Sequence, residues 1–255
     1  MKLDLYLVIG LTKESRHWSP EFLEALKTKL NPNSIQVVDL PGSGKFHHQP
    51  SPAKMEKIVN EARAQLKFNP GHQRMVIAMS LGGMSAWSWS SQHPEDFTHM
   101  VMINSSLGSL SPFWKRVQPK AIFKFFQIAS TKKGLKKEKH ILDLCSNNKK
   151  NADGIHHAWA KIGEEANMSL ANTIRQLIAG MRFKPEAAPK IPLLVIAAKH
   201  DRLAHFSCSE AIADHASAKL VLADDPEIGH AFHVDAPVML AETIQSWITE
   251  SARSS

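Results

Sequence analysis

The most informative segment of the sequence is Ala78-Met79-Ser80-Leu81-Gly82-Gly83. The apolar run at residues 75–78 indicates a buried strand, and the residues that follow are rich in Ala, Ser and Trp, as in a helix. Ser80 is therefore expected at a sharp corner between strand and helix, where its hydroxyl points outward. Such a strained corner needs small residues two positions before and after the serine, as Ala78 and Gly82 are. The stretch predicts a nucleophilic serine, although glycine-rich turns of this kind also bind phosphate.

Six short apolar runs are suited to buried strands, and helix-like segments separate most of them. The runs are residues 3–9, 35–38, 75–78, 100–103, 193–197 and 220–223. This alternation predicts an α/β fold with a mostly parallel central sheet and helices on both faces. Ser19-Pro20 and Ser51-Pro52 predict helix starts, and Asp235 opens the last helix before Pro237 in the same way.

The alternation of strands and helices stops after residue 105. We interpret residues 1–105 and 190–255 as the core, and residues 106–189 as an inserted helical cap. Residues 113–150 of this cap hold 11 Lys or Arg against two acids, Glu138 and Asp143. The formal net charge of +7 is therefore a property of the cap.

Basic and aromatic residues alternate in the cap, a pattern that fits an anionic membrane surface, an anionic substrate or nucleic acid. We favour the simpler interpretation that an amphipathic helix covers the active site with its apolar side and keeps its lysines in water. Trp114, Phe123, Phe126 and Trp159 are then the candidates to line the substrate pocket. No nucleic-acid-binding module is recognisable, so no such partner is expected. No run approaches the roughly 20 apolar residues of a membrane span, so any membrane contact would be weak and peripheral.

Ser80 needs a general base, and the base needs an acid that orients it. His230 follows the last predicted strand in a loop, and Asp201 directly follows the strand before it. Both are expected at the same edge of the sheet as Ser80, because the carboxyl ends of parallel strands meet there. The sequence therefore predicts a catalytic triad in the chain order Ser80, Asp201, His230.

Other residues compete for the roles of base and acid. His233 is the rival base, and Asp224 and Asp225 are the rival acids. We rank them lower because Gly229 lets the backbone bring His230 close. Taken alone, Asp201 could also simply cap the helix that follows it.

The whole pattern resembles the α/β-hydrolase superfamily, of the compact, capped serine hydrolase type. Residues 7–11 are similar to the family's strand that ends in His-Gly, with Ile9 in the place of the histidine. Residues 39–44, Asp-Leu-Pro-Gly-Ser-Gly, are similar to the family's D-x-P-G-x-G loop. The resemblance implies that the backbone N–H groups of Leu11 and Leu81 form an oxyanion hole.

The triad and the resemblance together imply hydrolysis of a small-molecule carboxylic ester or thioester through an acyl-enzyme on Ser80. The alternatives are carbon–carbon bond hydrolysis on the same triad and a non-catalytic, membrane-associated binding protein that uses the basic cap. The reaction needs no cofactor, and the 14 histidines show no metal-ligand spacing. Two widely separated cysteines fit a reducing cytoplasm.

Overall fold

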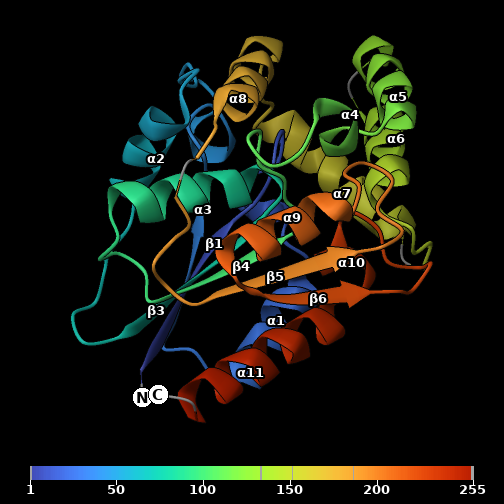
Figure 1. Cartoon of the computed structure of the whole chain (residues 1–255). Helices are drawn as coiled ribbons and strands as arrows, with labels where there is room; N and C mark the ends of the chain where they lie inside the picture. Colours follow the sequence, from blue (N-terminus) through green and yellow to red (C-terminus); the bar gives the residue numbers. More distant parts are fainter. Residues whose placement is uncertain (1, 133, 151, 186, 254–255) are drawn as a thin grey trace.

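The computed structural model describes residues 2–132, 134–150, 152–185 and 187–253 (Figure 1). Six strands of this part of the chain form one sheet in the order β2-β1-β3-β4-β5-β6, and all neighbours are parallel. The strands are β1 (Leu3–Val8), β2 (Ser34–Val38), β3 (Gln73–Met79), β4 (His99–Ile103), β5 (Leu193–Ala198) and β6 (Lys219–Ala223). Each matches one of the six apolar runs to within two residues at either end, so the predicted fold class is confirmed.

Side chains of the strands alternate between two cores, one on each face of the sheet. Tyr6 and Val8 of β1 pack in the first core, whereas Leu5 and Leu7 pack in the second. Helices cover both faces (Figure 1). The first face carries α2 (Met55–Arg63), α3 (Leu81–Gln92) and α9 (Ser207–Ala216), and the second carries α1 (Pro20–Leu30) and α11 (Pro237–Arg253).

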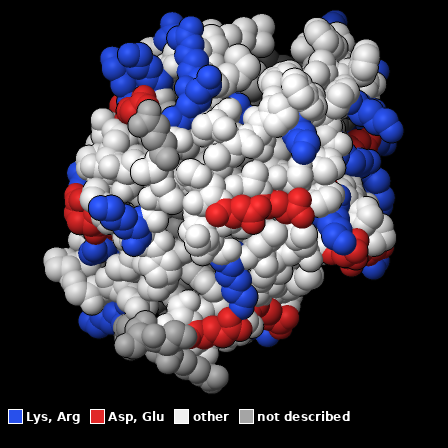
Figure 2. Space-filling model, in the orientation of Figure 1, with Lys and Arg blue, Asp and Glu red and all other residues white. Residues whose placement is uncertain are grey.

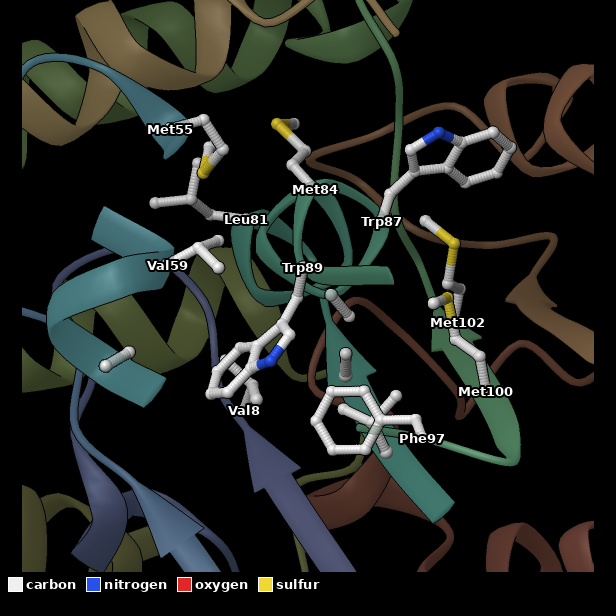
Figure 3. Close-up of a cluster of buried hydrophobic side chains, with 14 of the residues drawn as sticks. Val8, Met55, Val59, Leu81, Met84, Trp87, Trp89, Phe97, Met100 and Met102 are labelled. Carbon is white, nitrogen blue, oxygen red and sulfur yellow. The ribbon is translucent and has the colours of Figure 1, made fainter. Parts of the chain in front are cut away.

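Helix α3 is buried on all sides from Leu81 to Ser90. Figure 3 shows Leu81 pointing toward Met55 of α2. The ring of Trp89 on the same helix lies 5.2 Å from the ring of Phe97, centroid to centroid. A helix rich in Gly, Ala and Ser suits this place, because small side chains let it pack closely against both the sheet and α2. The residue that precedes α3 is thereby held on a rigid part of the fold.

The helix starts that the sequence predicts are confirmed in part. Ser19 caps α1, because its hydroxyl accepts a hydrogen bond from the Phe22 N–H and Pro20 is the first helical residue. The start predicted at Ser51 is wrong: α2 begins at Met55. Ser51 is buried, and its N–H donates to a side chain of the later segment, Asn172 Oδ1, at 2.9 Å. With this tertiary contact, residues 51–54 stay in a loop, and the helix begins about one helical turn later than predicted.

Between β4 and β5, in the segment 106–189, all regular secondary structure of the described residues is helical. In Figure 1 they lie beyond the carboxyl ends of the strands, with α8 on one side and α5 and α6 on the other. They are α4 (Phe113–Arg116), α5 (Pro119–Ser130), α6 (Leu135–Cys145), α7 (Ala152–Glu165) and α8 (Leu170–Arg182). The remaining short helices are η1 (Ser15–His17), η2 (Gly44–Phe46) and α10 (Phe232–Asp235). In the described part of the chain, no helix has the length and apolar character that crossing a bilayer requires.

Candidate active site

Ser80 occupies the corner between β3 and α3 with a left-handed backbone, φ 57° and ψ −121°. This conformation costs a residue with a side chain on the order of 1–3 kcal/mol. One hydrogen bond from its N–H and one to its carbonyl oxygen hold Ser80 in this conformation. The Ser80 N–H donates to Ile103 O at 2.9 Å, and the Ser105 hydroxyl donates to Ser80 O at 2.8 Å. The end of β4 therefore fixes the corner.

Two glycines let this corner pack against β1. A Cβ atom on Gly82 would lie 2.3 Å from Val8 O, so a larger residue would push α3 away from the sheet. A Cβ atom on Gly10 would lie 2.9 Å from Ser80 Cβ and 3.3 Å from Ser80 Oγ. The Ser80 hydroxyl therefore lies directly against the turn that follows β1.

The backbone N–H groups of Leu11 and Leu81 are the predicted oxyanion donors. Within the described residues, neither the Leu11 N–H nor the Leu81 N–H donates a hydrogen bond to the protein. Leu81 is the first residue of α3, where N–H groups have no partner inside the helix. Donors that are fixed in place before a reaction stabilise a negative oxygen better than mobile water does.

His230 and Asp201 form a buried pair at the ends of β6 and β5. His230 Nδ1 lies 2.7 Å from Asp201 Oδ2. The other carboxylate oxygen, Asp201 Oδ1, accepts the N–H groups of Leu203 at 2.7 Å and Ala204 at 3.0 Å. Because a carboxylate only accepts, Nδ1 carries the imidazole proton and Nε2 is left as an acceptor. No hydrogen bond in the described part of the chain joins Ser80 to His230, so the fold brings the predicted base and acid together but leaves the serine unbonded to them.

The rival residues lie in other environments. His233 Nδ1 accepts the Ser19 N–H at 3.1 Å, and burial lowers the pKa of His233 to about 3 with the Lys13 and His230 charges acting in the same direction. Asp224 is exposed and pairs with Lys199 at 2.7 Å. Asp225 is also exposed, and its carboxylate accepts the Glu227 N–H at 2.9 Å. None of these rivals is hydrogen-bonded to Asp201 or His230 among the described residues. We therefore keep His230 and Asp201 as the candidate base and acid.

The buried His233 gives a prediction about acid stability. In the folded protein its pKa is about 3, against about 6.5 for an unfolded histidine. Between these values the unfolded state binds a proton that the folded state does not, so the free energy of unfolding falls as the pH is lowered. We expect up to about 1.4 kcal/mol per pH unit from this residue below about pH 6.5. His17 adds to the effect in the same direction, because burial and the Lys13 charge also lower its pKa.

Denaturant titrations at several pH values from about 7 to about 5 measure this slope. In His233→Asn the amide oxygen can accept the Ser19 N–H in place of Nδ1, but the side chain does not titrate. Below about pH 6.5, we expect the slope of this variant to be smaller than that of the wild type by up to about 1.4 kcal/mol per pH unit. Equal slopes for the two proteins would contradict the assignment of His233 as a buried neutral histidine.

Asn104 is a positioning residue that the sequence did not reveal. It follows β4 with φ 46°, and its side chain is buried. Its amide nitrogen donates to His230 O at 2.9 Å and to Gly229 O at 3.2 Å, and its amide oxygen accepts the Ala198 N–H at 2.8 Å. One side chain thus ties the ends of β4 and β5 to the loop that carries His230.

We expect Asn104→Ala to lower the free energy of unfolding by about 2–4 kcal/mol, because it leaves buried backbone groups without partners. Asn31→Ala is the matched control, since Asn31 has nearly the same φ, 44°, and an exposed side chain. The control isolates the cost of a left-handed alanine, about 1 kcal/mol. Urea denaturation measures both variants. If Asn104→Ala loses no more stability than Asn31→Ala, the proposed tie between the strands and the His230 loop is wrong.

Asp235 joins the His230 loop to the segment after α6. Its carboxylate accepts the Gly229 N–H at 2.7 Å, the Asn147 N–H at 3.0 Å and the hydroxyl of Ser146. Burial raises the pKa of Asp235, and these donors oppose the shift. The sequence interpretation of Asp235 as the cap of the last helix is wrong. Pro237 does begin α11, but the carboxylate is directed to the loops.

Lys13 is a second residue whose contacts could not be predicted from the sequence. It lies two residues after Leu11, and its ammonium is 3.4 Å from the ring centre of Trp159 on α7 and 3.7 Å from Glu138 on α6. Burial lowers the pKa of Lys13, and the Glu138 carboxylate opposes the shift. The turn after β1 is therefore connected to both α6 and α7. Lys13 follows the end of β1 by five residues, and no pattern in the sequence around it indicates these contacts.

The four aromatic pocket candidates do not gather around Ser80. Trp159 is buried against Lys13, whereas Trp114, Phe123 and Phe126 are 64%, 77% and 71% exposed. The interpretation that the apolar side of this amphipathic segment covers the active site is wrong for α5, whose only buried residue is Ala121. A pocket role for the four side chains stays a prediction.

A cavity borders the candidate acid Asp201. It has a volume of about 680 Å³ and is lined by α5, α6 and the loops after β5 and β6, with Asp201 and Arg202 among its residues. Neither Ser80 nor His230 lines it. No group of three or more His, Cys, Asp or Glu side chains in the described ranges is arranged to hold a metal ion.

Comparisons with known proteins place the chain in a family. The family described as serine aminopeptidase S33 matches residues 17–237. No curated protein matches the chain. A membrane phospholipase A from a bacterium, described as a virulence factor, has a similar solved structure with 18% identity and a TM-score of 0.75, and the match covers all of this chain and 80% of that one.

Two further solved structures are similar over nearly their whole length. An esterase from Exiguobacterium antarcticum has 16% identity and a TM-score of 0.71, with 97% of this chain and 92% of that one covered. A lipase-esterase related protein from Clostridium acetobutylicum has 16% identity and a TM-score of 0.68, with 96% and 93% covered. At this identity the likeness shows the fold, which is the α/β-hydrolase fold. The chain therefore belongs to the serine aminopeptidase S33 family of α/β-hydrolases.

Proposed function

We propose that the protein is a serine hydrolase that cleaves a carboxylic ester or thioester through an acyl-enzyme on Ser80. The buried pair of His230 and Asp201 is the observation that carries the proposal, with 2.7 Å between Nδ1 and Oδ2. A buried carboxylate that bonds to histidine Nδ1 and is held in place by two backbone N–H groups is the arrangement that orients a general base. The family match and the printed names of the similar structures, which include esterases and a phospholipase, support the same class of reaction.

In the first half of the proposed reaction, Ser80 Oγ attacks the carbonyl carbon of the substrate while His230 Nε2 takes the hydroxyl proton. The carbonyl oxygen becomes negative and is bound by the Leu11 and Leu81 N–H groups. His230 then gives the proton to the leaving alcohol or thiol as the bond from the carbonyl carbon breaks, and the acyl group stays on Ser80.

In the second half, water attacks the acyl-enzyme, and His230 takes a proton from the water. Collapse of the intermediate breaks the bond to Ser80 Oγ, which recovers its proton from His230, and the acid product leaves. Asp201 keeps the imidazole in one tautomer and balances its charge throughout. The mechanism requires the Ser80 hydroxyl to reach Nε2, and catalytic hydrogen bonds of this kind commonly tighten only when substrate binds.

A panel of p-nitrophenyl esters and acyl thioesters of graded chain length tests the proposal, with an aminoacyl p-nitroanilide included because of the family's name. We expect turnover of esters or thioesters, with apolar acyl chains preferred. Turnover of the anilide alone would place the chain among amide hydrolases. Folded protein that turns over no member of the panel would contradict the proposal.

A further inference from the structure

Large apolar side chains are exposed on two helices of the segment 106–189. Among the described residues, ten of the twelve exposed large hydrophobic side chains lie in this segment, and the other two are Val238 and Met239 at the start of α11. On α5, Phe123 is 77% exposed and Phe126 is 71% exposed. On α8, Leu170 is 71% exposed and Ile174 is 47% exposed. Such a concentration on one part of a surface indicates a binding face rather than scattered surface residues.

Helix α8 is inverted relative to an ordinary surface helix. It buries the polar Asn172 and Gln176, and it exposes Leu170, Ile174 and Met181 along one stripe. The buried amides are used inside the protein: Asn172 donates to Gln49 O at 2.9 Å, and Gln176 donates to Pro41 O at 3.0 Å. The outward apolar stripe therefore has no role in packing the fold. The same holds for α5, which buries only Ala121.

The charged residues on three of the helices that expose these apolar side chains are all cations. Helices α4, α5 and α8 contain no Asp or Glu. Their exposed cations include Lys115, Lys120, Lys124, Arg175 and Arg182. In Figure 2 the ends of α8 and α5 are mostly white, with Lys and Arg beside them. A partner for this surface must therefore offer both an apolar layer and negative charge.

Both helices also border the candidate active site. A Cβ atom on Gly180 of α8 would lie 2.7 Å from a methyl group of Leu81, so α8 rests on the residue after Ser80. Gln118, just before α5, donates to Asp201 O at 2.6 Å. The exposed apolar side chains thus lie on elements that touch the neighbourhood of both Ser80 and Asp201.

We propose that the exposed faces of α5 and α8, with their cations, dock the protein onto an anionic phospholipid membrane. Such a membrane supplies acyl chains for the apolar side chains and headgroup charge for the lysines and arginines. Nucleic acid lacks the apolar layer, and a second copy of the chain would bring like charges together. The docking does not depend on the proposed hydrolysis, and vesicle binding without turnover measures it.

Co-sedimentation with vesicles tests the docking, with the full chain carrying Ser80→Ala so that lipid is not consumed. Vesicles of phosphatidylcholine alone are compared with vesicles that contain phosphatidylcholine and phosphatidylglycerol in equal parts, at low and at high salt. We expect binding to the anionic vesicles at low salt, weakened by salt. Phe123→Ser with Phe126→Ser is expected to weaken it about tenfold or more. Lys120→Gln with Lys124→Gln is expected to weaken it by more than about fivefold.

Val238→Ser with Met239→Ser is the control, because it removes two exposed apolar side chains, 50% and 42% exposed, at the start of α11. This variant should bind as the parent does. Leu170→Ser with Ile174→Ser tests the α8 side and should weaken binding as the α5 pair does. All these side chains are exposed, so unchanged melting temperatures are expected. Absence of binding at low salt, equal losses in the control, or a dimer that the α5 pair dissociates without any vesicle binding would each overturn the proposal.

Discussion

Ser80→Ala is expected to lower kcat/KM for ester hydrolysis by roughly 10⁴- to 10⁶-fold, because the acyl-enzyme cannot form without the hydroxyl. The fold should be unaffected, since the alanine Cβ replaces the serine Cβ that lies against Gly10. Steady-state kinetics with a p-nitrophenyl ester measure the loss. The small activity left would come from the backbone N–H groups of Leu11 and Leu81 and from substrate binding.

The matched control for this variant is Ser91→Ala, which removes a hydroxyl from the far end of the same helix. Ser91 Oγ donates to Trp87 O at 3.1 Å and lies away from the corner. We expect activity close to that of the wild type. If Ser80→Ala kept activity within tenfold of this control, Ser80 would not be the nucleophile.

Asp201→Asn is expected to lower kcat/KM by roughly 10⁴-fold, through the tautomer of His230. The asparagine oxygen can still accept the N–H groups of Leu203 and Ala204, which now bond to Asp201 Oδ1. Its NH₂ group then faces His230 Nδ1 and donates to it. The imidazole proton moves to Nε2, where the ring can no longer accept the Ser80 proton.

Asp224→Asn separates this effect from a general loss of acidic charge near β5 and β6. Asp224 is the rival acid, and it pairs with Lys199 at the surface. We expect this variant to retain nearly full activity. Loss of activity in Asp224→Asn together with an active Asp201→Asn would reverse the two roles.

The sheet was predictable because buried parallel strands carry unbroken apolar runs. The corner at Ser80 was predictable because the small residues around it are adjacent in the sequence. His230 and Asp201 could be placed on one edge because each follows its own strand. The hydrogen bond between them, which fixes the tautomer of His230, could not be predicted from the sequence, because the two residues are 29 positions apart. The prediction of a helix start at Ser51 was wrong because the Ser51 N–H donates to Asn172, a residue far along the chain.

The segment 106–189 was the least predictable part. Its amphipathic pattern indicates helices, but periodicity does not say which side of a helix faces the protein. On α8 the buried side is the polar one, because Asn172 and Gln176 bond to the backbone of other loops. Lys13 and Asn104 act through tertiary contacts and leave no pattern in the sequence around them.

Labelling with a fluorophosphonate, followed by intact mass and peptide mapping, tests the central claim that Ser80 is an activated nucleophile. Only a serine with a working general base reacts rapidly with this probe. We predict one adduct per chain, on the peptide that contains Ser80, and none in Ser80→Ala. Folded wild-type protein that stays unlabelled, or an adduct on any other residue, would contradict the account.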